Sequence, residues 1–206
     1  TRSATWQAST AGSSDAAATI LGLDRALHLN WSVDQMGEIG QQLGSDVPFF
    51  FAAPVACVTG RGERVRPLRT AGVRWVVLVN PGFPVETKWA YQQLSATRHG
   101  VRPVAQAMLD VAASGVLSWS EFNRLAENDF EAQVFGKHPV LAEIKHHFLA
   151  HGAEAALLSG SGATVFGVFA DRAVAERAGS AWIDRPGMKV FVVPTCDTGI
   201  EIRTED

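Results

Sequence analysis

The segment EAALLSGSGATVFGVFA, Glu154–Ala170, contains two apolar runs on either side of the small residues of Ser159–Gly162. Each run has the length and the apolar composition of a strand, so the segment predicts a strand, a turn and a second strand. Gly160 and Gly162 suit a hairpin turn, and glycines also allow a positive φ or the close approach of a ligand. The residues of the turn alone leave both interpretations open.

Further elements are predicted on both sides of this hairpin. The helical spacing of Leu141, Ile144 and Phe148 predicts one buried face of a helix over 138–151. Additional helices are expected near 86–95, 102–114, 118–126 and 171–182, with strands in VRWVVLVNPG (73–82) and MKVFVVPT (188–195). This order predicts an α+β fold in which helices pack on a mainly antiparallel sheet.

The first 68 residues are predicted to form a separate unit, so the expected domains are 1–68 and 69–206. A helix is expected over 14–29, with an apolar face made of Ala16, Ile20, Leu23 and Leu27. A second helix is expected in WSVDQMGEIGQQLG (31–44), with Ser32 as its N-cap, Gly44 as its stop and a face of Val33, Met36, Ile39 and Leu43. Next, SDVPFFF (45–51) predicts a turn that leads into an extended apolar run, and VACVTGRGERVRPL (55–68) predicts two short strands around a turn.

Composition and charge exclude several classes of protein. Apolar residues make up 47% of the 206 residues and charged residues 19%, which is typical of a folded globular chain. The net charge is −3 and no long basic run occurs, so we expect no nucleic-acid partner. The longest apolar runs contain prolines and are shorter than a membrane span, and the first residues lack the apolar region of a signal peptide. Cys57 and Cys196 lack metal-ligand spacing, so we expect reduced, mostly buried thiols and a cytoplasmic location.

Two segments near the N-terminus have residue types that suit phosphate chemistry. Gly12–Asp15 lies at the start of the predicted helix over 14–29, and the N–H donors and the dipole of a helix start bind phosphate well. The same residue types are also common helix caps. Asp46 lies between a helix stop and VPFFF, where apolar neighbours would partly desolvate its carboxylate and position it as a general base. A turn aspartate that bonds its own backbone is equally compatible with this segment.

Asn128, Asp129 and Glu131 lie near the start of a helical run in NRLAENDFEAQVF, 123–135. We expect these polar residues to cap the helix at the surface, because Asn and Asp are preferred at helix starts. The glycines of GRGE, 60–63, are expected to form a simple turn between two strands.

In their order and spacing, five segments together resemble one family closely. They are GSSDAAATILGLDRALHL, LGSDVPFFFAAPVACVTGRGE, NPGFPVETKWAY, ENDFEAQVF and LLSGSGATVFGVFAD, which together span Gly12 to Asp171. The chain resembles the 4-diphosphocytidyl-2-C-methyl-D-erythritol kinases of the GHMP small-molecule kinase superfamily. The resemblance implies a two-lobed α+β fold with a ferredoxin-like C-terminal lobe and a location in the bacterial cytoplasm. It also implies phosphoryl transfer from ATP, with Mg²⁺, to the 2-hydroxyl of a small-molecule substrate, diphosphocytidyl methylerythritol.

The resemblance further implies roles for particular residues. Asp46 matches the family's catalytic aspartate, and Thr87 lies where the family has a residue close to the substrate. The loop that holds the ATP phosphates is matched by Thr10, Ala11, Gly12, Ser13 and Ser14, with Ser14 also expected beside the metal. A second glycine-rich turn of the family is matched by Gly160 and Gly162, which are expected to be structural.

The chain departs from the family in two respects. Thr10 and Ala11 stand where the family's loop has glycines, and their Cβ atoms add bulk where the backbone should approach phosphate. The family also has a further part before this loop, with a catalytic lysine, whereas the first lysine here is Lys88. We therefore expect an incomplete N-terminal lobe, an exposed apolar face on the helix over 14–29, and self-association.

Three alternative functions follow from these departures and from the other segments. The first is another kinase of the superfamily, acting on homoserine or on a mevalonate-type alcohol. The second is a remnant that binds nucleotide without transfer, which the altered loop and the missing lysine favour. The third is a purely structural α+β domain whose Gly-Ser segments are caps and hairpin turns.

Overall fold

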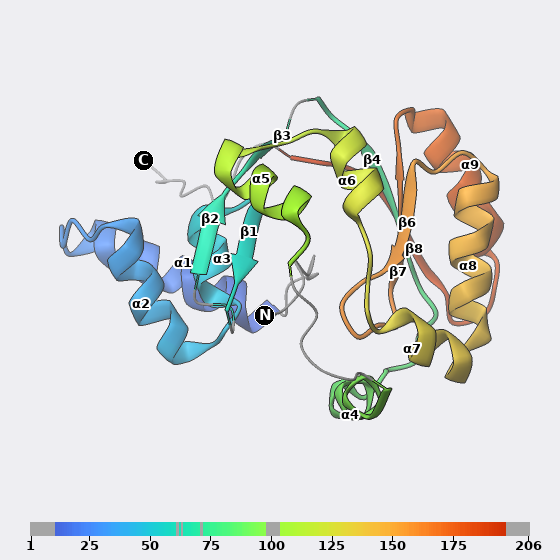
Figure 1. Ribbon diagram of the computed structural model, residues 1–206, viewed down its shortest axis with the longest axis horizontal. Helices are drawn as coiled ribbons and strands as arrows, with labels where there is room; N and C mark the ends of the chain where they lie inside the picture. Colours follow the sequence, from blue (N-terminus) through green and yellow to red (C-terminus); the bar gives the residue numbers. More distant parts are fainter. Residues whose placement is uncertain (1–10, 61, 63, 71, 98–103, 197–206) are drawn as a thin grey trace. The chain divides into compact units, whose positions relative to one another are not determined.

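The computed structural model describes residues 11–60, 62, 64–70, 72–97 and 104–196 of the chain (Figure 1). These residues form two compact units. The first contains the described residues up to 70 together with 104–118 and 196, and the second contains 72–97 and 119–195. Residues 104–118 thus group with the first unit although they follow residue 68 in the chain. The division of the chain into lobes at 1–68 and 69–206 stays a prediction. None of the described helices is long and apolar enough to cross a membrane.

An antiparallel sheet organises the second unit. Neighbouring strands hydrogen-bond in the order β6 (Ala155–Leu158), β7 (Val165–Phe169), β4 (Trp75–Asn80) and β8 (Lys189–Pro194). Each adjacent pair is antiparallel, which confirms the predicted hairpin and the predicted mainly antiparallel sheet. With one helix before β6 and another after β7, this strand order is that of a ferredoxin-like fold.

Helices α8 (Pro139–Ala150) and α9 (Arg172–Ile183) cover one face of this sheet (Figure 1). Leu141, Ile144 and Phe148 of α8 are completely buried, as their spacing predicts. Gly167 of β7 allows the Phe148 ring to lie on the sheet, because a Cβ there would lie 2.8 Å from Phe148 Cδ2. The burial of these apolar side chains is the main source of stability in the second unit.

The described part of the second unit also contains the helices α4 (Thr87–Thr97), α6 (Trp119–Leu125) and α7 (Glu131–Lys137). The first two correspond to the helices expected near 86–95 and 118–126. The third is short and begins directly after Phe130. Phe130 and Val134 are buried in the same core as α8 and α9, so this core fixes the position of the start of α7.

The helices of the first unit are α1 (Ala11–Ala26), α2 (Val33–Leu43) and α3 (Val47–Ala52), with α5 (Gln106–Ser114) from the later segment. A small core joins the first three and consists of Ala17, Ile20, Met36 and Val47. The predicted N-cap of α2 is confirmed, because Ser32 Oγ accepts a hydrogen bond from the Gln35 backbone N–H. The Gln35 side chain accepts one from the Ser32 backbone N–H in return, which completes a capping box.

The strands of the first unit form two pairs. The pair β1 (Ala56–Thr59) and β2 (Arg64–Pro67) is antiparallel and confirms the two strands expected in 55–68. The short strands β3 (Arg69–Thr70) and β5 (Val116–Leu117) pair in parallel and were not predicted. Two residues each are too short to leave a periodic signal in the sequence.

Three predictions for the first unit were wrong. The face predicted for α2 is buried only at its centre, because Val33 is 52% exposed and Leu43 is 65% exposed. The segment after Asp46 is the helix α3 and not an extended run, because Pro48 in its first turn has the φ that a helix requires. The face predicted for α1 is also wrong in its second half: Leu23 is 47% exposed and Leu27 is 61% exposed. The core that α2 and α3 provide reaches only the first half of α1, where Ala17 and Ile20 are buried.

The cysteines differ from each other in exposure. Cys57 of β1 is half-buried, and burial raises the pKa of its thiol, so it is kept as the weakly nucleophilic thiol form. Cys196 is exposed, so the expectation of mostly buried thiols was wrong for this residue. Both are free thiols, as expected.

Candidate functional site

The first turn of α1 contains Gly12, Ser13 and Ser14. The helix was predicted over 14–29, whereas the described α1 runs from Ala11 to Ala26 and includes these residues. A Cβ built on Gly12 would meet no atom of the described residues within 4 Å, so the backbone is open toward this part of the chain. Such a turn can receive an anion, since the positive end of the helix dipole adds to its donors. Thr10 lies outside the described residues.

Asp46 lies in the turn between α2 and α3 and is half-buried. Ser45 Oγ donates a hydrogen bond to Asp46 Oδ1 at 3.4 Å. Asp46 is the N-cap residue of α3, but its side chain makes no capping hydrogen bond to the described backbone of this helix. Asp46 therefore does not cap α3 through its side chain.

The turn around Asp46 lies close to two other turns of the first unit. A Cβ built on Gly44 would lie 4.0 Å from Ser13 Oγ, so the end of α2 is next to the start of α1. Gly62 has φ +116°, and a Cβ there would lie 2.6 Å from the Ser45 carbonyl oxygen. The turn between β1 and β2 thus packs on the Asp46 turn, and only glycine allows this approach. The first unit therefore gathers a helix start and a carboxylate in one region.

In the second unit, Thr87 lies at the start of α4, next to the glycine-rich turn between β6 and β7. Thr87 Oγ1 and Ser161 Oγ share a hydrogen bond of 3.0 Å, although the residues are 74 positions apart in the chain. Gly160 has φ +55° and Gly162 has φ +96°, which explains the glycines at both positions. The structure thus brings together Thr87 and the glycine-rich turn, two predicted site regions that lie far apart in the sequence.

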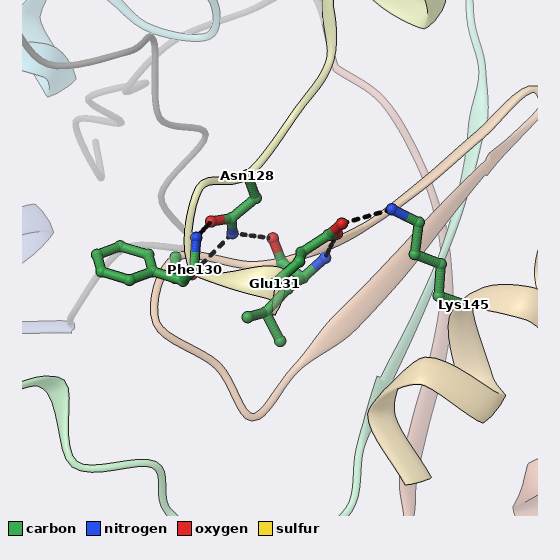
Figure 2. Close-up of polar contacts among 6 residues, drawn as sticks. Asn128, Phe130, Glu131 and Lys145 are labelled. Atoms are coloured by element: carbon green, nitrogen blue, oxygen red, sulfur yellow. Dashed lines mark hydrogen bonds and ion pairs between the residues drawn. The ribbon is translucent and has the colours of Figure 1, made fainter. Parts of the chain in front are cut away.

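A network of polar side chains also holds this turn (Figure 2). Asn128 Nδ2 donates to the carbonyl oxygens of Leu158 at 2.7 Å and Gly160 at 2.8 Å, and Asn128 Oδ1 accepts from the Phe130 N–H at 2.9 Å. Glu131 Oε1 accepts from the Leu158 N–H at 2.9 Å.

The expectation that Asn128 and Glu131 only cap a helix at the surface was therefore wrong. Asn128 does turn the chain into α7, but both side chains are partly buried and reach across to the β6–β7 turn. Glu131 Oε2 also pairs with Lys145 Nζ at 2.5 Å (Figure 2). The sequence carried no local signal of this role, since an Asn three residues before a Glu also suits an ordinary helix cap.

Among the described residues, no group of three or more His, Cys, Asp and Glu side chains could hold a metal ion. A metal bound through a dedicated set of protein ligands is thus not indicated in this part of the chain. Mg²⁺ in phosphate sites commonly has one or two protein ligands, and its other ligands are water and the phosphates themselves. The hydroxyl groups at the start of α1 and the Asp46 carboxylate suit that second arrangement.

Strands β6 and β7 of the ferredoxin-like sheet and their glycine-rich turn lie in the part of the chain that matches a known family. Residues 111–187 match the family GHMP kinases C terminal. This part of the chain therefore matches a GHMP kinase C-terminal domain, and the chain has the fold of GHMP kinases.

The chain is also similar in sequence to one particular group of enzymes. It is 39% identical over 184 residues to 4-diphosphocytidyl-2-C-methyl-D-erythritol kinase of Pelobacter propionicus. The aligned region covers 89% of this chain and 63% of that relative. The chain therefore spans less than two thirds of the length of that relative.

Solved structures have the same fold. The crystal structure of a 4-(cytidine 5'-diphospho)-2C-methyl-D-erythritol kinase is similar, with a TM-score of 0.65 at 27% identity. The superposed region covers 90% of this chain and 68% of the kinase chain. A homoserine kinase from Cytophaga hutchinsonii has a TM-score of 0.64 at 18% identity, over 93% of this chain and 68% of its own. The second similarity concerns the fold alone.

Proposed function

We propose that the chain belongs to an ATP-dependent kinase that phosphorylates the 2-hydroxyl of 4-diphosphocytidyl-2-C-methyl-D-erythritol, a step of non-mevalonate isoprenoid precursor synthesis in the bacterial cytoplasm. The observation that carries the proposal is the meeting of the α1 start with the Asp46 turn in the first unit. It is supported by the 39% identity to the Pelobacter propionicus protein of that name.

In this proposal, the start of α1 binds the phosphates of ATP. The backbone N–H groups of Gly12, Ser13 and Ser14 are the donors, and the helix dipole attracts the negative charge. The space beside Gly12, which the described residues leave open, lets phosphate oxygens approach the backbone closely. Thr10 and Ala11 belong to the same proposed loop. Ser14 Oγ would hold Mg²⁺, which when bound neutralises charge on the phosphates.

Asp46 acts on the alcohol in the proposed reaction. Its carboxylate accepts a hydrogen bond from the 2-hydroxyl, orients that oxygen toward the γ-phosphorus and takes the proton as the new O–P bond forms. The bond between the γ-phosphorus and the bridging oxygen breaks, and ADP leaves. Thr87 contacts the substrate, and Gly160 and Gly162 shape the turn beside it.

A substrate panel tests the proposal. Purified chain is incubated with Mg-ATP and one of three alcohols: diphosphocytidyl methylerythritol, homoserine or mevalonate. We expect ADP release above the ATP-only rate with the first alcohol alone, because the 39% identical relative is named for it. Release with homoserine or mevalonate only would contradict the proposed substrate and favour another kinase of the superfamily.

A second candidate function is nucleotide binding without transfer. It is favoured by Ala11, which stands at the first position of α1 where glycine would give the phosphates the closest approach. Calorimetric titration with the nonhydrolysable ATP analogue AMP-PNP separates the two candidates. Binding of the analogue together with no ADP release for any alcohol would favour this second function over the first.

A further inference from the structure

The turn between β6 and β7 closes with hydrogen bonds of its own. The Ser159 N–H donates to the Thr164 carbonyl at 2.8 Å, and the Gly162 N–H donates to the Ser159 carbonyl at 2.9 Å. A glycine-rich hairpin of this kind needs no support from distant side chains to form. The side chains of Asn128 and Glu131 nevertheless reach it from 30 and 27 residues away in the chain.

Asn128 fixes the turn through both ends of its amide. The Phe130 N–H can only donate, so the Asn128 oxygen faces it and the NH₂ group faces the carbonyls of Leu158 and Gly160. Both N–H bonds of the side chain are thereby used on the turn. A carboxylate of the same shape would still accept from Phe130 but would have no hydrogen to donate.

Glu131 connects the turn to the helical layer. One carboxylate oxygen accepts from the Leu158 N–H, and the other pairs with Lys145 of α8. The Glu131 side chain is 16% exposed and that of Lys145 is 22% exposed, so both charges are largely removed from water. Ion pairs removed from water add little net stability because of their desolvation cost, whereas they can define one geometry.

The turn also presents a hydroxyl group to α4. Ser161 Oγ lies 3.0 Å from Thr87 Oγ1, and Thr87 is exposed. A Cβ built on Gly162 would lie 3.1 Å from Leu158 Cδ1 and 3.4 Å from Val85 Cγ2, so the backbone of the turn has little room to move toward the core. The position of the turn therefore decides where the Ser161 hydroxyl meets Thr87.

We propose that Asn128 and Glu131 are positioning residues: with Lys145 they hold the Ser159–Gly162 turn so that the Thr87–Ser161 hydroxyl pair is presented to the alcohol substrate. The part that concerns substrate rests on the proposed function. Neither residue is assigned contact with the reacting atoms. The two hydroxyls would bind the polar groups of the alcohol, while Asn128 and Glu131 act through the backbone of the turn.

The first test is amide hydrogen exchange measured by NMR on the chain without ligand. Asn128→Asp keeps the bond from Phe130 and removes both donated bonds, so exchange at the Ser159 and Gly162 amides should become about tenfold faster. Exchange in the middle of β7 should stay within about twofold of wild type. Asn30→Asp is the matched control, because Asn30 donates to the nearby His28 carbonyl at an exposed site.

Unchanged exchange in the turn, or a rise spread evenly over the second unit, would overturn the positioning role. Glu131→Gln is a second variant in case Asn128→Asp folds poorly. Its amide oxygen can still accept from Leu158 while the ion pair with Lys145 is lost, so the faster exchange should again be confined to the turn. Glu143→Gln, which breaks an exposed pair with Arg185, is its control.

The second test is kinetic and separates positioning from a merely structural role. Asn128→Asp should raise the KM for diphosphocytidyl methylerythritol about tenfold, while kcat and the KM for ATP change less than about threefold. A fall in kcat alone, in step with the folded fraction, would contradict the proposal. If wild-type chain transfers no phosphate, the proposed function fails, and the exchange experiment alone then decides whether Asn128 and Glu131 hold the turn.

Discussion

Gly167 gives the most direct test of the packing of α8 on the sheet. An alanine Cβ at this position would lie 2.8 Å from Phe148 Cδ2 and 3.0 Å from Phe169 Cε2, both in completely buried rings. Contacts under 3.0 Å force neighbouring atoms to shift, and overpacking of this kind costs about 1–3 kcal/mol. Gly167→Ala should therefore lower the free energy of unfolding of the second unit by that amount.

The matched control is Gly136→Ala in α7, where a new Cβ would meet nothing within 4 Å. Alanine is favoured over glycine inside a helix, so this variant should be neutral or more stable by up to about 1 kcal/mol. Urea unfolding followed through the native amide NMR signals of β7 measures the second unit alone.

The double variant Gly167→Ala with Phe148→Leu tests the cause of the loss. A smaller side chain at 148 makes room for the new methyl group, so the two substitutions should couple favourably by about 1 kcal/mol. Equal stability of Gly167→Ala and Gly136→Ala, or strict additivity in the double variant, would refute the described contact between Gly167 and the Phe148 ring.

Three further predictions concern stability, pH and association. Ser32→Ala removes the capping box of α2 and should cost about 1 kcal/mol in the urea unfolding of the first unit, whereas no loss would mean that the cap contributes nothing. Burial of His147 lowers its pKa, so stability should fall as the pH drops below about 6.5, and His147→Gln should flatten this pH dependence in thermal unfolding. Leu27 and Leu43 are 61% and 65% exposed, so the chain should self-associate with rising concentration in sedimentation velocity experiments, and Leu27→Gln with Leu43→Gln should reduce this. A monodisperse monomer of the wild-type chain would contradict the third prediction.

The sign of the pH effect follows from the surroundings of His147. Burial is the largest cause of its lowered pKa, and His151 and Arg185 lower it further, while the Ala178 carbonyl and Glu143 raise it. The folded chain thus binds the proton less readily than the unfolded chain. The contribution of His147 to stability is therefore complete when the pH lies above the pKa of the unfolded state, and it is lost as the pH falls below that pKa. His146→Gln removes an exposed imidazole from the same helix and is the control; an equal effect of both variants would contradict the assignment.

The elements with a strong local pattern could be predicted from the sequence. Leu141, Ile144 and Phe148 repeat at helical spacing, and all three are completely buried in α8. The cap at Ser32 depends on residues only three positions apart, so it too was predictable. The hairpin around Ser159–Gly162 has both its strands and its turn within 17 residues of sequence.

The elements that depend on distant partners could not be predicted. The apolar run after Asp46 has the length of a strand, and only its packing against α1 and α2 as a helix decides between the two. The exposure of Leu23 and Leu27 depends on how far the neighbouring helices extend along α1. In the candidate site, the approach of Ser13 to Gly44 is likewise a property of the folded unit.

The role of Asn128 shows the same limit at a functional position. Its type and its place before a helix indicate a cap, and the bond from Phe130 agrees with that prediction. Its two bonds to Leu158 and Gly160 join positions 30 and 32 residues apart, which no local pattern encodes.

ADP release by Asp46→Asn tests the central claim most directly. The variant keeps the size of the side chain and removes the base, so substrate-dependent release from Mg-ATP should fall by about 10²–10⁴-fold. Asp34→Asn, an exposed position in the first turn of α2, is the control and should retain the wild-type rate. Wild-type release that depends on diphosphocytidyl methylerythritol and is lost only in Asp46→Asn is the predicted result. Equal release by wild type and Asp46→Asn would contradict the account.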